Sequence, residues 1–308
     1  MPKKLFTGIA LATLAVLAAC SAPAGESDES DQLPLVVTTF SVVASITEQI
    51  GGERIDVRSI TPVGAEVHEY DPTPSDIQAA ADADLVIENG LWLEEWFGQF
   101  IAHSEAPTAI ASEGIDARPI TRLPGHPDDP GEEDDLPLDP HGWISPVQSL
   151  TYVDNIETAL AELSPEDADY FAERAEDYRA ELNRILSEAE ERTAALEDPV
   201  LVTCEGAFGY LADDLGFDEH YLWPLNAENE GTPQQVEAQI EFVAENDVTA
   251  IFCESTVNDD AQTQVAETTG ADLAGPLFVD SVTEDDGPAP SHLALLEHTI
   301  NEILVTHE

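Results

Sequence analysis

The sequence predicts an α/β protein with two lobes, each built on parallel sheets flanked by helices, and one long rigid helix that joins them. Two observations support this fold class. Short apolar strand patterns alternate with helical patterns from Leu35 to Ile87 and again after Pro199, and strands separated by helices form parallel sheets. Between these two regions, a helical pattern of about 33 residues runs without an internal Gly or Pro.

The first half is predicted to alternate strands and helices around a proline-containing loop at 61–73. Gly51 and Gly52 close the first helix, and Pro74 opens the second, since Pro fits the first turn of a helix. The predicted strands are 35–40, 55–60 and 85–87, and the predicted helices are 42–50 and 74–81. The α/β pattern breaks after Arg118, and an acidic, Pro- and Gly-rich surface loop is expected at 124–135.

The long helix is predicted to begin at Ser164 and to end near Leu196. Ser164 is a suitable N-cap, Pro165 fits the first turn, and the acids that follow favour the positive end of the helix dipole. At 1.5 Å per residue, this helix would be about 50 Å long. We expect it to act as a rigid connection between the two lobes.

The second half is predicted to repeat the α/β alternation after Pro199. The predicted strands are 200–204, 249–253 and 272–277, and the predicted helices are 206–215, 233–245, 258–269 and 290–305. The resulting domain boundaries are a signal segment at 1–19, a tether at 20–33, a first lobe at 34–163, a linking helix at 164–198 and a second lobe at 199–308.

The N-terminus has the features of a secretion signal. Lys3 and Lys4 precede an apolar run from Leu5 to Ala19, which is too short to cross a bilayer as a helix. The run ends in Leu17-Ala-Ala-Cys20 and resembles a bacterial lipobox, in which Cys20 would carry a lipid and become the new N-terminus. An ordinary cleaved signal is the alternative. The lipobox interpretation predicts an extracytoplasmic protein anchored to the membrane through a polar tether.

The charge balance is strongly acidic. Sixty-four acids stand against ten bases, for a formal charge of -54. Such a surface repels phosphate backbones, so we expect no nucleic-acid partner, whereas divalent cations suit this field. Beyond the two N-terminal lysines, every base is Arg. Such a composition is found in salt-adapted proteins, where high ionic strength screens the repulsion between acids. An acidic secreted protein without salt adaptation is an equal alternative.

Besides Cys20, the chain has two cysteines, Cys204 and Cys253. Each lies at the end of a predicted strand. If these strands are parallel neighbours, their ends lie about 5 Å apart, which suits a disulfide in an oxidising compartment. Two buried free thiols are the alternative interpretation.

Four polar side chains lie beyond the predicted strands or just before a helix, where parallel α/β sheets place their ligands. They are His68, His141, Glu205 and Asp280. Each one alone is more typical of a solvated or helix-capping residue. Two imidazoles from the first half and two carboxylates from the second could together close around one cation between the lobes.

Several motifs occur in order across the chain and together resemble one family. They are His68-Glu-Tyr-Asp-Pro-Thr-Pro-Ser-Asp76, Asp139-Pro-His-Gly-Trp143, Glu205-Gly-Ala-Phe-Gly-Tyr210, Glu228-Asn-Glu-Gly-Thr-Pro233, Glu254-Ser-Thr256 and Asp280-Ser281. They are similar to motifs of the metal-binding lipoproteins of zinc and manganese ABC importers, the cluster A-I solute-binding proteins. The resemblance covers about residues 34–307.

This resemblance implies that His68, His141, Glu205 and Asp280 hold a metal at the interface of the two lobes. Members with Glu at the third position commonly import manganese or iron, and zinc importers usually have His there. We therefore expect a Mn²⁺ receptor that docks as a monomer on an ABC permease, with a Zn²⁺ or Fe²⁺ receptor of the same family as the alternative. Two carboxylates also make the donor set harder and neutralise a dication.

Two functions outside this family remain open from the sequence alone. A secreted metallohydrolase could use the same cation to activate water, but the chain has no His-Glu-x-x-His motif or nucleophile motif. A surface lipoprotein used for adhesion would bind a host ligand without needing His68. We expect no enzymatic activity. If Cys204 and Cys253 are bridged, the bridge should fix the strand end that carries Glu205, and reduction should then change metal affinity.

Overall fold

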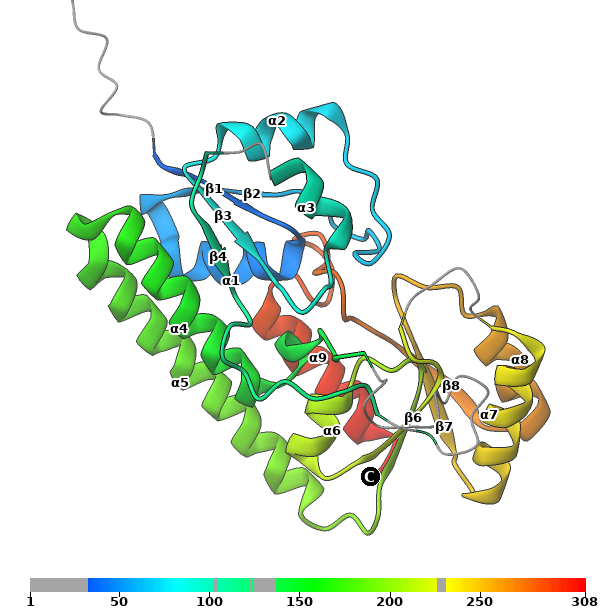
Figure 1. Cartoon of the computed structure of the whole chain (residues 1–308). Coiled ribbons are helices and arrows are strands. Elements are labelled where there is room, and N and C mark those ends of the chain that lie inside the picture. The colour runs from blue at the N-terminus through cyan, green and yellow to red at the C-terminus, as the bar shows by residue number, and fades with distance from the viewer. Residues whose placement is uncertain (1–32, 102–104, 122, 124–136, 226–230) are drawn as a thin grey trace, which may run out of the picture. The chain divides into compact units, whose positions relative to one another are not determined.

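The computed structural model describes residues 33–101, 105–121, 123, 137–225 and 231–308 (Figure 1). The predicted signal segment, Cys20 and nearly all of the tether lie outside these residues. So do the whole acidic loop at 124–135 and part of the Glu228–Pro233 motif. Within the described ranges, none of the helices combines the length and the apolar character needed to cross a membrane.

The first half contains a parallel four-stranded sheet in the order β2-β1-β3-β4. Its strands are β1 (Leu35–Thr38), β2 (Asp56–Ser59), β3 (Leu85–Glu88) and β4 (Thr108–Ile110). The central strand β1 aligns Val36 with Val57 on one side and with Leu85 on the other. The three predicted strands are confirmed with slightly different ends. The sequence did not predict β4, which has only three residues and is partly exposed.

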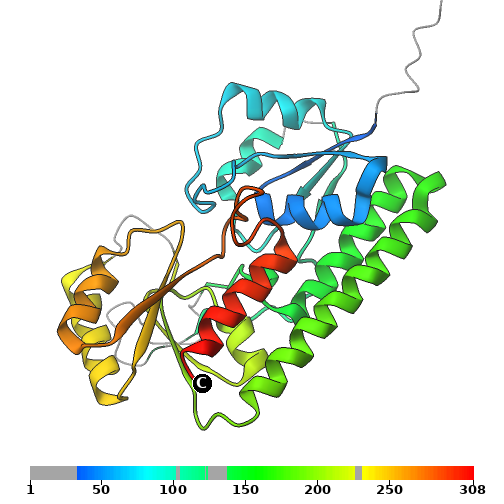
Figure 2. The same ribbon diagram turned by 180° about the vertical axis from the view of Figure 1, so that it is seen from behind.

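Helices cover both faces of this sheet because neighbouring residues of β1 point to opposite sides. Val36 packs in one apolar cluster with Ile46 and Ile50 of α1 (Ser41–Gly51). Val37 packs on the other face with Ala79 of α2 (Pro74–Asp82) and Phe97 of α3 (Glu95–Ile101). Figures 1 and 2 show α1 on one side of the sheet and α2 with α3 on the other. The predicted helices at 42–50 and 74–81 are confirmed.

The second half contains two parallel pairs of strands, β5-β6 and β7-β8. The strands are β5 (Val200–Glu205), β6 (Asp218–Trp223), β7 (Ala250–Glu254) and β8 (Asp272–Leu277). Its helices are α6 (Gly209–Leu215), α7 (Pro233–Glu245), α8 (Asp260–Thr269) and α9 (His292–Val305). Strand β6 was not predicted from the sequence, because it begins with three polar residues. The helix predicted at 206–215 begins three residues later in the structure, as α6.

The long helix is shorter than predicted. A 3-10 turn at Pro165–Asp167 precedes α5, which spans Ala168–Thr193 and is therefore about 39 Å long. At its C-terminal end α5 stops at Thr193, three residues before the predicted end at Leu196. Along α5 the buried side chains recur every three or four positions and form one apolar stripe: Phe171, Ala175, Tyr178, Leu182, Ile185 and Ala189.

Arginines connect α5 to helices of both halves. Arg179 pairs with Asp154 on α4 (Pro146–Leu163), and Arg174 Nε donates to the carbonyl oxygen of Gln49 on α1 at 2.6 Å. Arg184 pairs with Glu297 on α9. Figures 1 and 2 show α4 and α9 lying along α5. The molecule thus has two lobes with parallel sheets flanked by helices, and a long helix that contacts both.

Trp92 lies outside the core, contrary to what its spacing in the sequence indicates. The helical spacing of Trp92 and Trp96 predicts that both lie in the core. Trp96 is partly buried, but the Trp92 side chain is 78% exposed. Trp92 precedes α3 and has a left-handed backbone, with φ of 68°, so it follows no helical periodicity.

Candidate metal centre

His68 lies in the loop that follows β2, and two contacts hold this loop. The indole Nε1 of Trp96 donates to the carbonyl oxygen of Val67 at 2.8 Å. The backbone nitrogen of His68 donates to Glu66 Oε1 at 2.6 Å. Val67 is fully buried, so the residue immediately before His68 is anchored in the first lobe. Only 9% of the His68 side chain remains exposed.

His141 is fully buried at the start of a 3-10 helix, Gly142–Ile144, just before α4. Asp139 Oδ1 accepts from the backbone nitrogen of His141 at 2.9 Å and lies 2.8 Å from its ring Nδ1. A carboxylate accepts hydrogen bonds, so it favours the tautomer with hydrogen on Nδ1. The lone pair of Nε2 is then available to a metal, which is the usual arrangement for a metal-binding histidine.

Glu205 is the last residue of β5 and is fully buried. Its backbone nitrogen donates to Glu254 Oε2, at the end of β7, at 3.2 Å. Burial raises the pKa of the Glu254 carboxyl to about 8. The preceding residue, Cys204, forms a disulfide with Cys253, and their Cα atoms are 4.9 Å apart. The predicted bridge is confirmed. The two bridged strands, β5 and β7, belong to different strand pairs, since β5 pairs with β6 and β7 pairs with β8.

Asp280 lies three residues after the end of β8 and is fully buried. Thr256 Oγ1 donates to Asp280 Oδ2 at 3.0 Å. Its other oxygen, Oδ1, has no hydrogen-bond partner among the described residues. A buried carboxylate oxygen without a donor is costly in free energy, and a bound cation would relieve that cost.

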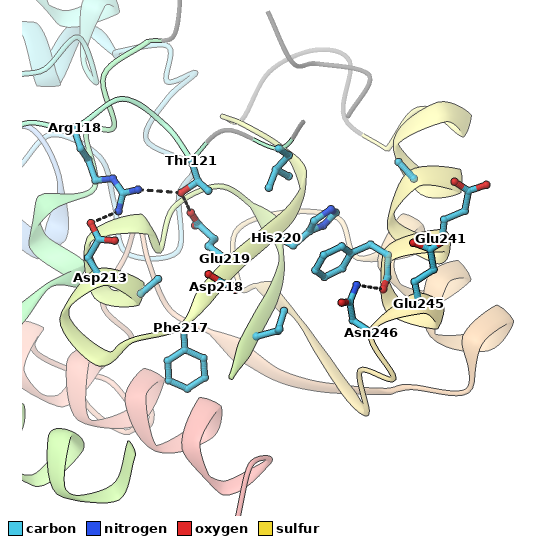
Figure 3. Close-up of a pocket in the computed structure, with 15 residues that line it drawn as sticks. Arg118, Thr121, Asp213, Phe217, Asp218, Glu219, His220, Glu241, Glu245 and Asn246 are labelled. Carbon is cyan, nitrogen blue, oxygen red and sulfur yellow. Dashed lines mark hydrogen bonds and ion pairs between the residues drawn. The ribbon is translucent and has the colours of Figure 1, made fainter. Parts of the chain in front are cut away.

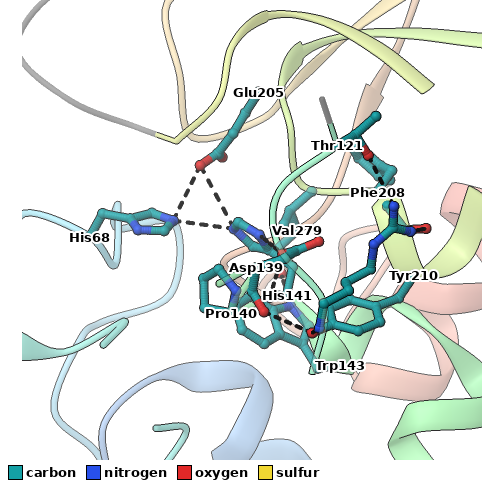
Figure 4. A network of polar contacts seen from close by, with 12 residues as sticks. His68, Thr121, Asp139, Pro140, His141, Trp143, Glu205, Phe208, Tyr210 and Val279 are labelled. Atoms are coloured by element: carbon teal, nitrogen blue, oxygen red, sulfur yellow. Dashed lines mark hydrogen bonds and ion pairs between the residues drawn. The ribbon is translucent and has the colours of Figure 1, made fainter. Parts of the chain in front are cut away.

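These four residues converge. One ligand atom from each of His68, His141, Glu205 and Asp280 lies within 4.8 Å of all the others. His68 Nε2 is 3.3 Å from His141 Nε2 and 3.3 Å from Glu205 Oε1, and His141 Nε2 is 3.7 Å from the same oxygen. Figure 4 shows these three side chains pointing toward one another from three separate segments. The structure thus brings together the whole set that the sequence predicted.

The electrostatics of the cluster favour a cation. Burial, and secondly the nearby His141, lower the pKa of His68 well below its usual range, so this imidazole is held neutral. Burial, and secondly Glu66, raise the pKa of Asp280 well above its usual range. Burial is the main cause of both shifts, because it disfavours the charged form of each group. Neutral imidazoles and carboxylates that need a counter-charge together suit a divalent cation.

Of two cavities among the described residues, one is lined by neighbours of this cluster and the other is not. One of about 610 Å³ is lined by Glu66 and Glu69, which flank His68, and by Thr256, the partner of Asp280. The other, of about 560 Å³, is lined by Arg118 and by acids including Glu219 and Glu241 (Figure 3). The second cavity contains none of the four converging residues, and its Arg118 is already paired with Asp213. The metal-binding chemistry is therefore not in that cavity.

Sequence reasoning found the four converging residues but gave no role to their partners. Asp139, Glu254 and Thr256 all stand in the motifs, but their contacts depend on how distant segments meet. The one local signal was Asp139, since an aspartate two residues before a histidine can bond its backbone nitrogen.

The fold and the cluster agree with one protein family. Residues 36–305 match the family model described as "Zinc-uptake complex component A periplasmic". The chain belongs to this family, the metal-binding solute-binding proteins of ABC importers. Its members are binding proteins and not enzymes, so the metallohydrolase interpretation has no support.

Individual relatives cover nearly the whole chain. The iron-binding protein YfeA of Yersinia pestis is 39% identical over 97% of this chain and 94% of its own length. The manganese-binding lipoprotein MntA of Halalkalibacterium halodurans is 33% identical over 98% of this chain and 97% of its own. Among solved structures, a Mn-bound periplasmic metal binding protein from Candidatus Liberibacter asiaticus superposes with a TM-score of 0.80, at 30% identity, over 89% of this chain and 100% of its own.

Proposed function

We propose that this protein captures extracytoplasmic Mn²⁺ and delivers it to the membrane permease of an ABC importer. The observation that carries the proposal is the convergence of His68, His141, Glu205 and Asp280 on one buried point. In this proposal the metal is cargo, held between a first lobe at 34–163 and a second lobe at 199–308, with 164–198 as the linking segment.

The donor set favours Mn²⁺ over Zn²⁺ as the physiological cargo. Two carboxylates and two imidazoles supply as many oxygen as nitrogen ligands, and the two negative charges neutralise a dication. Carboxylates that bind through both oxygens would raise the coordination number above the four that structural zinc sites adopt. Glu205 supports this assignment most directly, because zinc importers of the family usually have His at this position.

Zn²⁺ and Fe²⁺ are the alternative cargoes. Affinity for a given site generally rises from Mn²⁺ through Fe²⁺ toward the end of the series, so Zn²⁺ would bind more tightly than Mn²⁺ in vitro. Relatives that bind iron and manganese match this chain over nearly its full length. Uptake by the cell, and not affinity in the test tube, therefore identifies the cargo.

Two further parts of the proposal concern the N-terminus and assembly. Cys20 would carry a lipid that anchors the protein to the outer face of the membrane, with residues 21–33 as a polar tether. The relative MntA is named a lipoprotein, which supports this assignment. We propose that the protein is a monomer when it meets the permease.

The test is elemental analysis of protein purified without added metal, followed by titration with Mn²⁺. We expect one bound cation per chain in the wild type. His68→Ala and Glu205→Gln should each lose stoichiometric binding, because each removes a ligand from a set of four. The matched control is Glu237→Gln, which removes one exposed acid from α7 and should bind as the wild type does.

Two results would contradict the proposal at different levels. A stoichiometric cation that persists in both His68→Ala and Glu205→Gln would show that the metal is held elsewhere. In a deletion strain, loss of Zn²⁺ uptake with normal Mn²⁺ uptake would contradict the choice of cargo and leave the ligand set intact.

A further inference from the structure

Asp280 is encoded in the second half of the chain, but the backbone on both sides of it is bound to the first half. The residue before it, Val279, and the two after it, Ser281 and Val282, all contact groups of the first lobe. Within the second lobe, the Asp280 side chain accepts a hydrogen bond from Thr256. The position of this carboxylate is therefore set largely by the lobe that carries the two histidines.

Trp143 makes the first of these contacts. Its indole Nε1 donates to the carbonyl oxygen of Val279 at 2.9 Å, and its side chain is fully buried. Trp143 also belongs to the turn that carries His141, and the two ring centroids are 5.1 Å apart. Figure 4 shows Trp143 beside His141 and close to Val279. One side chain thus joins the backbone next to His141 to the backbone next to Asp280.

Ser41, at the start of α1, makes the second set of contacts. Its Oγ accepts from the backbone nitrogen of Val282 at 3.2 Å and lies 3.1 Å from Ser281 Oγ. Ser281 Oγ in turn accepts from the backbone nitrogen of Gly64 at 2.6 Å, in the loop that leads to His68. Ser41 and Ser281 are both buried, so water competes little for these bonds.

We propose that Trp143 and Ser41 are positioning residues that hold Asp280 against His68 and His141, so that three of the four ligands form one unit on the first lobe. Glu205, at the end of β5, is then the one ligand carried by the strands of the second lobe. This inference rests on the proposed metal site and adds to it which residues fix the ligand geometry.

The test compares Ser41→Ala with Ser45→Ala. Both serines lie on α1 and are buried, and Ser45 Oγ accepts from the backbone nitrogen of His292, away from Asp280. The two variants should lower the melting temperature of the metal-free protein by similar amounts. Ser41→Ala should weaken Mn²⁺ binding about tenfold, in the range found when groups that orient a metal ligand are removed. Ser45→Ala should leave Mn²⁺ affinity unchanged.

Trp143→Phe provides a second, independent variant, because it removes the indole nitrogen and keeps an aromatic ring. We expect weaker Mn²⁺ binding and an altered Mn²⁺ electron paramagnetic resonance spectrum, which reports the ligand geometry. If Ser41→Ala binds Mn²⁺ with wild-type affinity and an unchanged spectrum, the positioning role is wrong. If the wild type binds no metal, the proposed function itself is wrong, so the two failures are distinguishable.

Discussion

At the scale of single residues, the position of a side chain at a strand end was the informative signal. Glu205 could be chosen among 64 acids because it directly follows a predicted strand, and His68 because it lies in the loop after another. The hydrogen bonds that orient these ligands could not be predicted. Trp143 reaches Val279 across 136 residues, and no local pattern reports such a contact.

His292 illustrates how burial sets a protonation state. Its Nε2 lies 2.7 Å from the carbonyl oxygen of Trp143, which can only accept, so Nε2 carries the hydrogen. Its Nδ1 then accepts from the hydroxyl of Tyr178 at 2.8 Å. Burial lowers the pKa of His292 to about 4, which keeps the ring neutral in the folded protein.

This lowered pKa predicts a pH dependence of stability. Below an unfolded-state pKa of about 6.5, the unfolded chain binds a proton that folded His292 does not, so stability is lost as the pH falls toward 4. The loss from this residue is about 3 kcal/mol. The His292→Gln variant lacks this pH-dependent loss of stability. The difference in unfolding free energy between the wild type and the variant should therefore shrink from pH 7 to pH 4. Urea titrations with a chelator measure this, and a constant difference would contradict it.

At the scale of elements, long and strongly patterned segments were predicted well, and short ones were not. The helix at 233–245 and the strand at 272–277 have the predicted ends, and Pro233 marks the start of that helix, where proline is favoured. β4 and β6 were missed because one is very short and the other begins with Asp-Glu-His, which reads as polar. The long helix was predicted to run too far at both ends, because the 3-10 turn at Pro165–Asp167 and the turn after Thr193 share its helical composition.

The disulfide joins two elements and carries its own prediction. It closes a segment with a sequence separation of 49, for which the chain-entropy model gives about 4 kcal/mol of stabilisation. Replacing both Cys204 and Cys253 by Ala should lower the unfolding free energy by about this amount. It should also weaken Mn²⁺ binding, because Cys204 precedes Glu205. Denaturant unfolding and metal titration measure the two effects separately, and unchanged affinity would mean that the bridge is only structural.

At the scale of the whole molecule, the dominant property is charge. With a formal charge of -54, acidic side chains repel one another across the surface, and folding brings them closer together. The few bases are used in structure, since four of the eight arginines lie on α5 at positions 174, 179, 184 and 192. The composition predicted this field, and the helix predicted at 164–196 already contained these four arginines. Their partners on α1, α4 and α9 could not be predicted, because those contacts join distant segments.

Salt should therefore stabilise the protein. The Debye length falls from about 10 Å at 0.1 M to about 3 Å at 1 M, so added NaCl screens repulsion between surface carboxylates. With a chelator present, we expect the melting temperature to rise by about 5 °C or more over this range. At pH 4 many carboxylates are protonated, and the increment should shrink. A melting temperature independent of NaCl at pH 7 would contradict this explanation.

Helix α9 packs against the first half of the chain, and this packing limits how the protein can be divided into fragments. Residues 292–305 come last in the chain, yet His292 bonds to Ser45 on α1 and to the turn after His141, and Tyr178 of α5 bonds to His292. A fragment ending at residue 198 would expose the apolar surface that α9 covers. We therefore expect that the two lobes do not fold independently, and that complementation by separately expressed halves requires the C-terminal helix to be supplied in trans.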